Sequence, residues 1–350
     1  AKDWVKYTFN YANSHPAYST NQVAKLYFKD NDSYAQPTKL DLTDIDYAIT
    51  DYAFLGITTI TELITTKYPG EHSFDGNTIT KLEINGVNYL DGFTPILDNV
   101  VDLTLNFVAL NSIMPQMPNL KNLYLVNYAK GYNTAKFYEN YQTNKIENIY
   151  YKGNVNDWLK LEFNNELQNP MMVADNFYFY IDNQYQTITT LNITSSNLSN
   201  YQFSGLNSLT TINISEDVDL TNASKAFYLV NNVTNISMPF KNANLFNLFT
   251  NELDDTTPSF KVVKILGNEI NRGISSTVES LYLANTITTI DASFNEANIS
   301  KLYYEGTIAD WCNIDFASIY ANPALGSEKI FMNNEEIDNI TIPKEITSIK

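Results

Sequence analysis

The sequence predicts a β-rich α/β repeat protein: a solenoid with a curved parallel sheet, short irregular helices and loops on the convex side, and inserted β-hairpins. Three observations support this fold class. Short apolar-x-apolar units recur along the chain, a set of residue types returns with a second and longer period, and paired strand-like runs flank turn residues. We therefore expect residues 1–350 to form a single array of stacked repeats.

The short period is defined by units in which two apolar residues flank one variable residue. The units at 82, 103 and 123 are 21 and 20 residues apart, and steps of 21 separate 191 from 212 and 281 from 302. Steps of about 20 to 29 residues are typical of leucine-rich repeats. In a strand the two apolar side chains point into the core and the middle one points to the opposite, concave face. The units lie at 82–84, 103–105, 123–125, 191–193, 212–214, 281–283, 302–304 and 340–342.

A longer period is marked by the three tryptophans. Their spacings are 154 and 153 residues, and each follows Asp, precedes Phe by five positions and precedes Pro by twelve. The second and third copies also have Gly five residues before Trp. We infer internal super-repeats of about 153 residues that start near residues 1, 155 and 308. Each start lies a few residues before one of the tryptophans Trp4, Trp158 and Trp311.

Each super-repeat predicts a helix and a hairpin. The Asp-Trp segment should open a short helix, with Asp near the N-terminus where its charge complements the helix dipole. The Trp is either part of an aromatic ligand clamp or, as we favour, a packing wedge. Runs at 177–181 and 188–193 flank the turn residues 182–183, and runs at 330–332 and 337–342 flank 333–334.

Several segments of the chain share a family pattern: 281–290 with Phe294, 340–349, Ala53-Phe54 before Ile60, and the Tyr-Tyr-x-Gly…Asp-Trp…Asn-Pro segments. At these segments the chain resembles the BspA-type leucine-rich-repeat family of bacterial surface proteins. The likeness is weakest at 240–255, which lacks a clean strand unit. The resemblance implies an exported or anchored protein associated with adhesion to host or matrix molecules. The family offers no catalytic residues to carry over, and its ligands vary.

Composition excludes several classes of protein. The formal net charge of −17 and the lack of a basic stripe argue against nucleic acid as a partner. No apolar run reaches 18 residues, so no membrane span is expected. The single cysteine, Cys312, cannot form an intramolecular disulfide and should be a small core residue. The chain begins without Met or a signal peptide, and both ends look cut, so we expect a fragment of a longer extracellular or cell-surface protein.

Residues suited to catalysis or cofactor binding are scarce, so we expect neither an enzyme nor a cofactor. The only histidines are His15 and His72, and His15 takes the position before Pro that Asn169 and Asn322 take in the other copies. No zinc spacing or phosphate-binding Gly motif is present. Calcium at the acidic turns 30–33 and 216–219 stays open, although solvated turns are the simpler interpretation, and no metal site is predicted.

Binding through the concave face is the function that the sequence favours. Tyr adds contact area at little entropic cost, and Asn both donates and accepts hydrogen bonds. The ligand would be a protein or a glycan. A structural spacer that holds other domains from the cell surface is the alternative, and a carbohydrate-active enzyme is a more remote one. The predicted binding residues are Thr104, Tyr124, Asn192, Asn213, Tyr282 and Tyr303.

Overall fold

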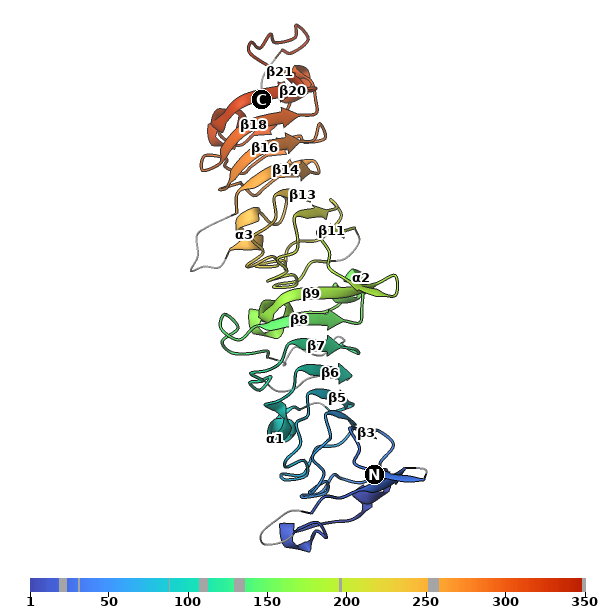
Figure 1. The fold of residues 1–350 in the computed structure, drawn as a ribbon. Helices are drawn as coiled ribbons and strands as arrows, with labels where there is room; N and C mark the ends of the chain where they lie inside the picture. Colours follow the sequence, from blue (N-terminus) through green and yellow to red (C-terminus); the bar gives the residue numbers. More distant parts are fainter. Residues whose placement is uncertain are drawn as a thin grey trace. The chain divides into compact units, whose positions relative to one another are not determined.

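The computed structural model describes residues 1–18, 24–30, 32–87, 89–106, 113–128, 136–194, 197–250 and 258–347. The chain divides into two compact units: unit 1 is Ala1–Leu161 with Leu167–Gln186, and unit 2 is Glu162–Glu166 with Thr187–Lys350. Each unit contains one eight-stranded sheet. Both sheets are mainly parallel and the helices are few and short (Figure 1). The β-rich class with parallel sheets is therefore confirmed.

The sheet of unit 1 has its strands side by side in chain order, from β3 to β10. All pairs are parallel except the β9–β10 hairpin. A separate antiparallel pair, β1 and β2, precedes the sheet. The strands are β1 (Phe28–Asp30), β2 (Ser33–Ala35), β3 (Lys39–Leu42), β4 (Glu62–Thr65), β5 (Lys81–Asn85), β6 (Asp102–Asn106), β7 (Asn122–Leu125), β8 (Ile146–Tyr151), β9 (Ala174–Ile181) and β10 (Gln184–Gln186).

The main sheet of unit 2 also follows chain order, and it ends in the antiparallel β20–β21 hairpin. A second, three-stranded parallel sheet pairs β15, β17 and β19, each of which follows a strand of the main sheet. The strands are β11 (Thr190–Ile193), β12 (Thr211–Ile214), β13 (Asn235–Pro239), β14 (Phe260–Leu266), β15 (Glu269–Ile270), β16 (Thr277–Leu283), β17 (Thr289–Ile290), β18 (Asn298–Tyr304), β19 (Asp315–Phe316), β20 (Ser327–Met332) and β21 (Glu335–Glu336).

The helices are single turns between the strands. The α-helices are α1 (Thr94–Leu97), α2 (Val155–Trp158), α3 (Leu245–Phe249) and α4 (Ile308–Cys312). The 3₁₀ turns are η1 (Lys2–Lys6), η2 (Ala12–Ser14), η3 (Asp91–Phe93), η4 (Glu166–Gln168), η5 (Pro170–Val173), η6 (Ile319–Ala321) and η7 (Pro323–Gly326). In the part of the chain that the structure describes, none of the helices has the length and apolar character needed to cross a lipid bilayer.

Alternation along each strand separates a buried face from an open one. In unit 1, the inward positions before and after the middle residue are buried on every strand from β5 to β9. The register holds these positions level from strand to strand, so the apolar side chains form continuous rows beneath the sheet. One such row is Leu82, Leu103, Leu123, Ile149 and Phe177, and its counterpart in unit 2 is Leu191, Ile212, Ile236, Val263, Leu281 and Leu302.

The long period corresponds to one structural motif. The tyrosine that ends β8 folds back over the glycine two residues on, because a Cβ at Gly153 would lie 2.5 Å from the Tyr151 ring. Gly306 has the same relation to Tyr304, also at 2.5 Å. The predicted short helix follows in all three copies, as α2, α4 and the 3₁₀ turn η1.

Both α-helices of this motif begin with a reciprocal cap. Asn154 Oδ1 accepts from the Asp157 N–H at 3.1 Å, and Asp157 Oδ2 accepts from the Asn154 N–H at 3.2 Å. Thr307 and Asp310 make the same exchange at the start of α4. The prediction that the Asp lies in the first helical turn is confirmed. Trp158 is fully buried, 5.1 Å from the rings of both Tyr151 and Phe177, which confirms its role as a packing residue.

Both predicted turns are two-residue hairpin turns. Asp182 and Asn183 have φ of 50° and 62°, and Asn333 and Asn334 have 49° and 66°, as a type I′ turn requires. The returning strands are shorter than expected, because β10 and β21 end before the second predicted runs. Residues 190–193 join the second sheet as β11 instead.

Seven of the eight predicted strand units lie in strands, and the eighth is wrong. Residues 340–342 form no strand, and Ile340 and Ile342 are 55% and 43% exposed. A lone unit cannot bury its own apolar side, and no described strand pairs with this one. The irregular stretch predicted at 240–255 contains α3, while residues 251–257 lie outside the described part of the chain.

Candidate functional site

The candidate site is the open face of the two sheets, where the middle residue of each strand projects. In unit 1, Thr104 on β6 and Tyr124 on β7 are direct neighbours. In unit 2, Asn192 and Asn213 are neighbours on β11 and β12. The other two predicted residues of unit 2, Tyr282 and Tyr303, are neighbours on β16 and β18. That all six form one continuous surface stays a prediction, because two lie in unit 1 and four in unit 2.

A ladder of stacked tyrosines forms part of the open face of unit 1. Tyr124 and Tyr150 stack with ring centroids 4.6 Å apart at 13°, and Tyr150 and Tyr178 stack at 4.8 Å and 16°. Tyr185 of the hairpin stands edge-on to Tyr150, at 5.2 Å. These rings follow the spacing of neighbouring strands, since all three ladder residues occupy the middle position of their strand. We call Tyr124, Tyr150 and Tyr178 the first ladder.

A cation lies beside the hairpin end of the first ladder. Lys152 Nζ is 3.3 Å from the centroid of the Tyr180 ring and 5.8 Å from that of Tyr185. Tyr180 and Tyr185 in turn meet edge to face at 5.1 Å. The ammonium is therefore held against the negative face of an aromatic ring, a contact typical of cation recognition.

Unit 2 contains a second ladder at the equivalent place in its super-repeat. Tyr282 and Tyr303 stack at 4.5 Å and 7°, and Tyr303 and Phe331 stack at 4.6 Å and 16°. In register, Lys264 is the next residue beyond Tyr282, and its Nζ is 2.8 Å from Glu305 Oε1. The second ladder, Tyr282, Tyr303 and Phe331, thus ends beside an ion pair.

Amide side chains are hydrogen-bonded between neighbouring strands of both sheets. In unit 1, Asn122 Nδ2 donates to Asp102 Oδ1 at 2.7 Å, and Asn148 Nδ2 donates to Asn122 Oδ1 at 2.9 Å. Tyr178 donates its hydroxyl to Asn148 Oδ1 at 3.4 Å, which links this row to the ladder. In unit 2, Asn213 Nδ2 donates to Asn192 Oδ1 at 2.8 Å, and both residues are exposed. The amides are thus aligned in one direction along each sheet.

Stacking determines which part of each ring a ligand can reach. Tyr150 and Tyr303 have rings on both faces, so they present edges and hydroxyl groups. Burial raises the pKa of Tyr124, Tyr150 and Tyr282 above the usual value of a phenol, so their hydroxyls stay neutral donors. Open ring faces are found only at the ends of a ladder. Within the ladders, sugar stacking, which needs an open face, is therefore limited to the end residues Tyr124, Tyr178, Tyr282 and Phe331.

Sequence reasoning missed four aromatic residues of these surfaces. Tyr150 and Phe331 occupy the middle of the runs 149–151 and 330–332, and Tyr178 has the same position in 177–179. The rule that selected Tyr124 would have selected them. Tyr185 could not be found in this way, because it belongs to the antiparallel strand β10.

The two histidines and the cysteine have structural contacts. His15 is 2% exposed, and its Nδ1 accepts from the Ala17 N–H at 3.1 Å. Asn169 and Asn322 accept from the backbone two residues on in the same manner, at 2.9 and 3.0 Å. His72 stacks on Tyr52 and contacts Asp75, and Cys312 is buried.

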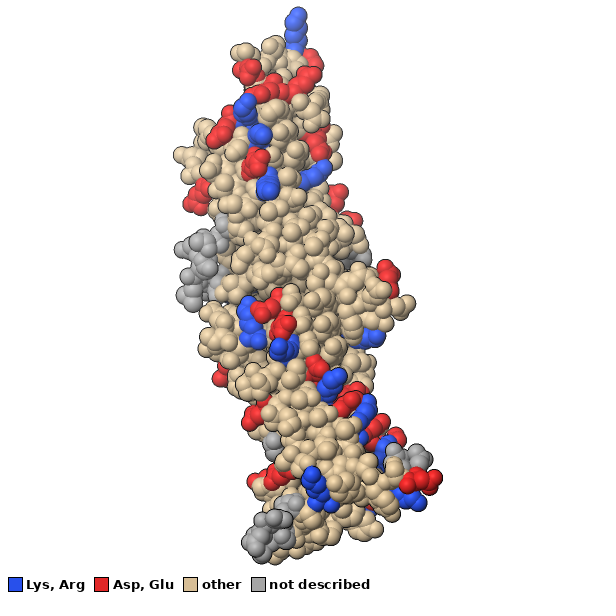
Figure 2. Space-filling model, in the orientation of Figure 1, with Lys and Arg blue, Asp and Glu red and all other residues tan. Residues whose placement is uncertain are grey.

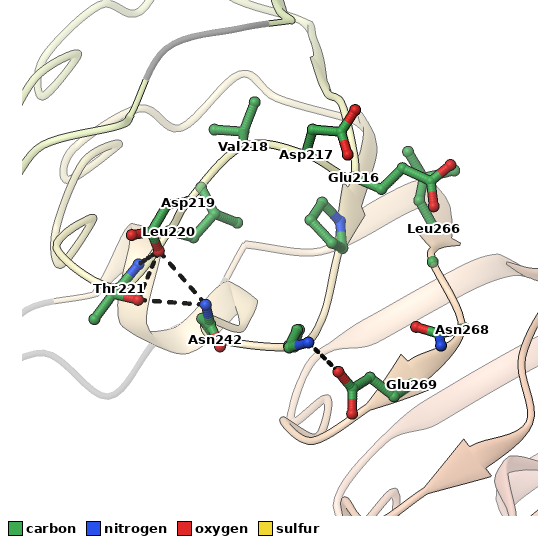
Figure 3. A pocket seen from close by; sticks show the side chains of 13 residues that line it. Glu216, Asp217, Val218, Asp219, Leu220, Thr221, Asn242, Leu266, Asn268 and Glu269 are labelled. Carbon is green, nitrogen blue, oxygen red and sulfur yellow. Dashed lines mark hydrogen bonds and ion pairs between the residues drawn. The ribbon is translucent and has the colours of Figure 1, made fainter.

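The acidic turn at 216–219 lines the pocket in Figure 3, which has a volume of about 440 Å³. The Asp219 carboxylate points toward Thr221 and Asn242, away from those of Glu216 and Asp217. Its Oδ1 accepts from the Thr221 N–H and hydroxyl at 2.9 and 2.6 Å. Throughout the described ranges, no three acidic, His or Cys side chains are grouped to hold a metal ion. For the other candidate turn, Asn31 lies outside those ranges.

Surface charge is mixed in sign. On the face shown in Figure 2, red and blue side chains alternate in small groups, and no basic stripe is visible. Opposite charges pair between strands: Lys39 with Glu62 on the neighbouring strand, and Lys264 with Glu305, which lies beyond β16.

No protein-family model matches the chain, and no curated protein matches it either. Among solved structures it is similar to a leucine rich cell surface protein from Faecalibacterium prausnitzii, with 11% sequence identity and a TM-score of 0.26. That comparison covers 85% of this chain and 92% of the other.

Proposed function

We propose that the chain is a binding module of an extracellular or cell-surface protein, and that it recognises a protein or glycan ligand through the open face of its sheets. The single observation that carries the proposal is the pair of aromatic ladders. Each places tyrosine hydroxyls and ring edges in a row on a surface built from neighbouring strands. Aligned tyrosines and amides are the side chains that recognition surfaces use most.

The architecture belongs to the same proposal. We infer a leucine-rich-repeat solenoid with a curved sheet, of the BspA type, in which both super-repeats belong to one array. The supporting features are the chain-order stacking of parallel strands and the steps of about 20 residues between core positions. Adhesion to host or matrix molecules then follows from the resemblance in sequence.

We also propose that the chain acts without catalysis. The side chains best suited to proton transfer or nucleophilic attack have other contacts: His15 caps a backbone N–H, and Cys312 is packed in the core. The acidic pocket has its Asp219 carboxylate engaged by Thr221. A carbohydrate-active enzyme would need a free acidic pair at hydrogen-bond reach of a sugar.

The proposal is tested by screening the purified chain against a glycan array and against immobilised matrix and mucin proteins. We expect a saturable interaction that is weakened at least about tenfold when Tyr124 and Tyr282 are both changed to Ala, a loss typical of central aromatic contacts. The matched control is the double change to Phe, which keeps the rings and should retain most of the affinity. Circular dichroism verifies that both variants fold.

A structural spacer is the second candidate, and one observation favours it. Stacked rings and amide rows are cross-strand pairs that stabilise a sheet whether or not a ligand binds. If the folded protein binds nothing in the screen while the double Ala variant loses stability, the ladders serve the sheet alone and the spacer is the better description.

A further inference from the structure

A groove of about 200 Å³ lies at the free end of the first ladder, on the open face of β4 to β7. Its lining includes Ile64, Glu83, Asp102, Thr104 and Tyr124. All of these belong to unit 1, so the groove is a feature of a single unit. This volume can hold the end group of one side chain and is smaller than a typical ligand-binding pocket.

The groove exists because the ladder stops at Tyr124. One face of this ring is stacked on Tyr150, so the other face is turned toward the next strand, β6. The residue level with Tyr124 on β6 is Thr104, whose short side chain leaves the ring face uncovered. An aromatic face therefore forms one wall of the groove, with Thr104 as its floor.

The opposite side of the groove is acidic. Glu83 is level with Thr104 on the far strand, and Asp102 precedes Thr104 by two residues on the same face. Each carboxylate accepts one amide hydrogen bond, from Asn85 at 3.0 Å and from Asn122 at 2.7 Å. Among the described residues, neither forms an ion pair with a cationic side chain. Lys81, which is level with Asp102 and with Glu62, also lines the groove, and the three carboxylates against this one lysine leave the lining net negative.

Unit 2 shows how the protein itself fills the corresponding place. At the free end of the second ladder the residue level with Tyr282 is Lys264, where unit 1 has Thr104 level with Tyr124. The Lys264 ammonium reaches across β16 to Glu305, 2.8 Å away. In unit 2 the residue level with the end of the ladder is thus a cation, whereas in unit 1 it is the neutral Thr104.

We propose that the groove of unit 1 binds the guanidinium group of an arginine side chain presented by a protein partner. A guanidinium is planar, so it can lie flat on the open face of Tyr124 while it donates to Glu83 and Asp102. It is also less strongly hydrated than an ammonium, which favours Arg over Lys at a stacked site. This inference rests on the proposed function and names the chemistry of its ligand.

The test is a titration of the full chain with a blocked peptide that contains three arginines, followed by fluorescence anisotropy of a label on the peptide. Because the formal net charge is −17, any cationic peptide is attracted to the protein without specificity. Two peptides of the same length provide the controls, one with lysine at each arginine position and one with neutral citrulline. We expect the arginine peptide to bind several-fold more tightly than the lysine peptide, and citrulline to lose at least about tenfold.

Variants of the groove locate the site. Thr104→Lys places in unit 1 the residue that unit 2 has, and should abolish the preference for arginine. Glu83→Gln and Asp102→Asn should each weaken binding about tenfold. Glu279→Gln, which removes one exposed carboxylate from β16 in unit 2, is the matched control and should leave binding unchanged. Equal affinity for the arginine and lysine peptides, or full binding by the folded Thr104→Lys variant, would overturn the inference. A ligand from the wider screen that depends on Tyr282 and ignores Thr104→Lys would overturn it too, and would leave the proposed function standing.

Discussion

Replacing His15 by Asn removes a titratable group from a buried position and keeps the hydrogen-bond acceptor there. His15 Nδ1 accepts from the Ala17 N–H at 3.1 Å, as Asn169 does at the same place in the second copy. The imidazole also packs on Phe9, with ring centroids 4.5 Å apart. The substitution therefore separates the role of the acceptor from that of the ring and its charge.

The direction of the effect follows from the pKa. Burial lowers the pKa of His15, so between that value and the unfolded value of about 6.5 the unfolded chain binds more protons than the folded one. Stability therefore falls as the pH drops through this window, and the loss is complete below the folded pKa. Protonation also removes the acceptor for Ala17, so we expect the wild type to lose about 1–3 kcal/mol. At pH 8 the variant should be about 1 kcal/mol less stable, because it lacks the ring contact with Phe9.

Urea denaturation at pH 8 and pH 5 measures both effects. The free-energy difference between wild type and His15→Asn should shift by about 1–3 kcal/mol in favour of the variant on going to pH 5. His72→Asn, at an exposed histidine, is the control and should follow the wild type. The reasoning is refuted if wild type and His15→Asn lose stability in parallel, since the carboxylates they share would then explain all of the pH dependence.

Substitutions at four further positions test the motif of the super-repeat. Trp158→Ala should lower the free energy of unfolding by about 3–5 kcal/mol, and Trp311→Ala should lower it by less because Trp311 is partly exposed. Denaturant unfolding measures both losses, and equal losses would contradict the difference in burial. Thr307→Ala removes the cap on the Asp310 N–H and should lower stability by about 1 kcal/mol in calorimetry, while Thr307→Ser should be close to neutral. Asn183 has φ of 62°, so Asn183→Gly should be tolerated and Asn183→Ala should destabilise the protein by about 1 kcal/mol. An Asn183→Ala variant that is more stable than the wild type in thermal unfolding would argue against the left-handed turn.

The fold could be predicted where its signal is repeated. Apolar alternation at a constant step identified β5 to β7, because each strand there fills the same position in the register. It missed β3, β4, β13 and β14, whose spacing is set by loops of varying length rather than by the strand itself. It also assigned a strand to residues 340–342, where the pattern is present but no described strand covers it.

For the candidate site, the sequence could indicate which residues share a face of the sheet. The middle-residue rule placed Tyr282 and Tyr303 on one face, and the two are neighbours in register. The middle-residue rule cannot show that neighbouring rings stack and cover each other's faces, because stacking depends on the side-chain rotamers and on the twist of the sheet. Nor can it show that Thr104 opens a groove beside Tyr124, because the contribution of a short side chain appears only next to its neighbour.

The uniform register also bears on how such a chain changes length over generations. Three successive strands pair in the same register, with Leu191, Ile212 and Ile236 at the same level. Each of these strands can therefore pair with another in the same way. Excision of the 21 residues from Leu191 to the position before Ile212 would join Thr190 to Ile212 and leave the remaining inward positions unshifted. Recombination between misaligned copies can therefore add or delete whole periods without new compensating mutations. A one-residue change inside a strand would exchange the inward and outward positions, whereas the loops between the strands already differ in length.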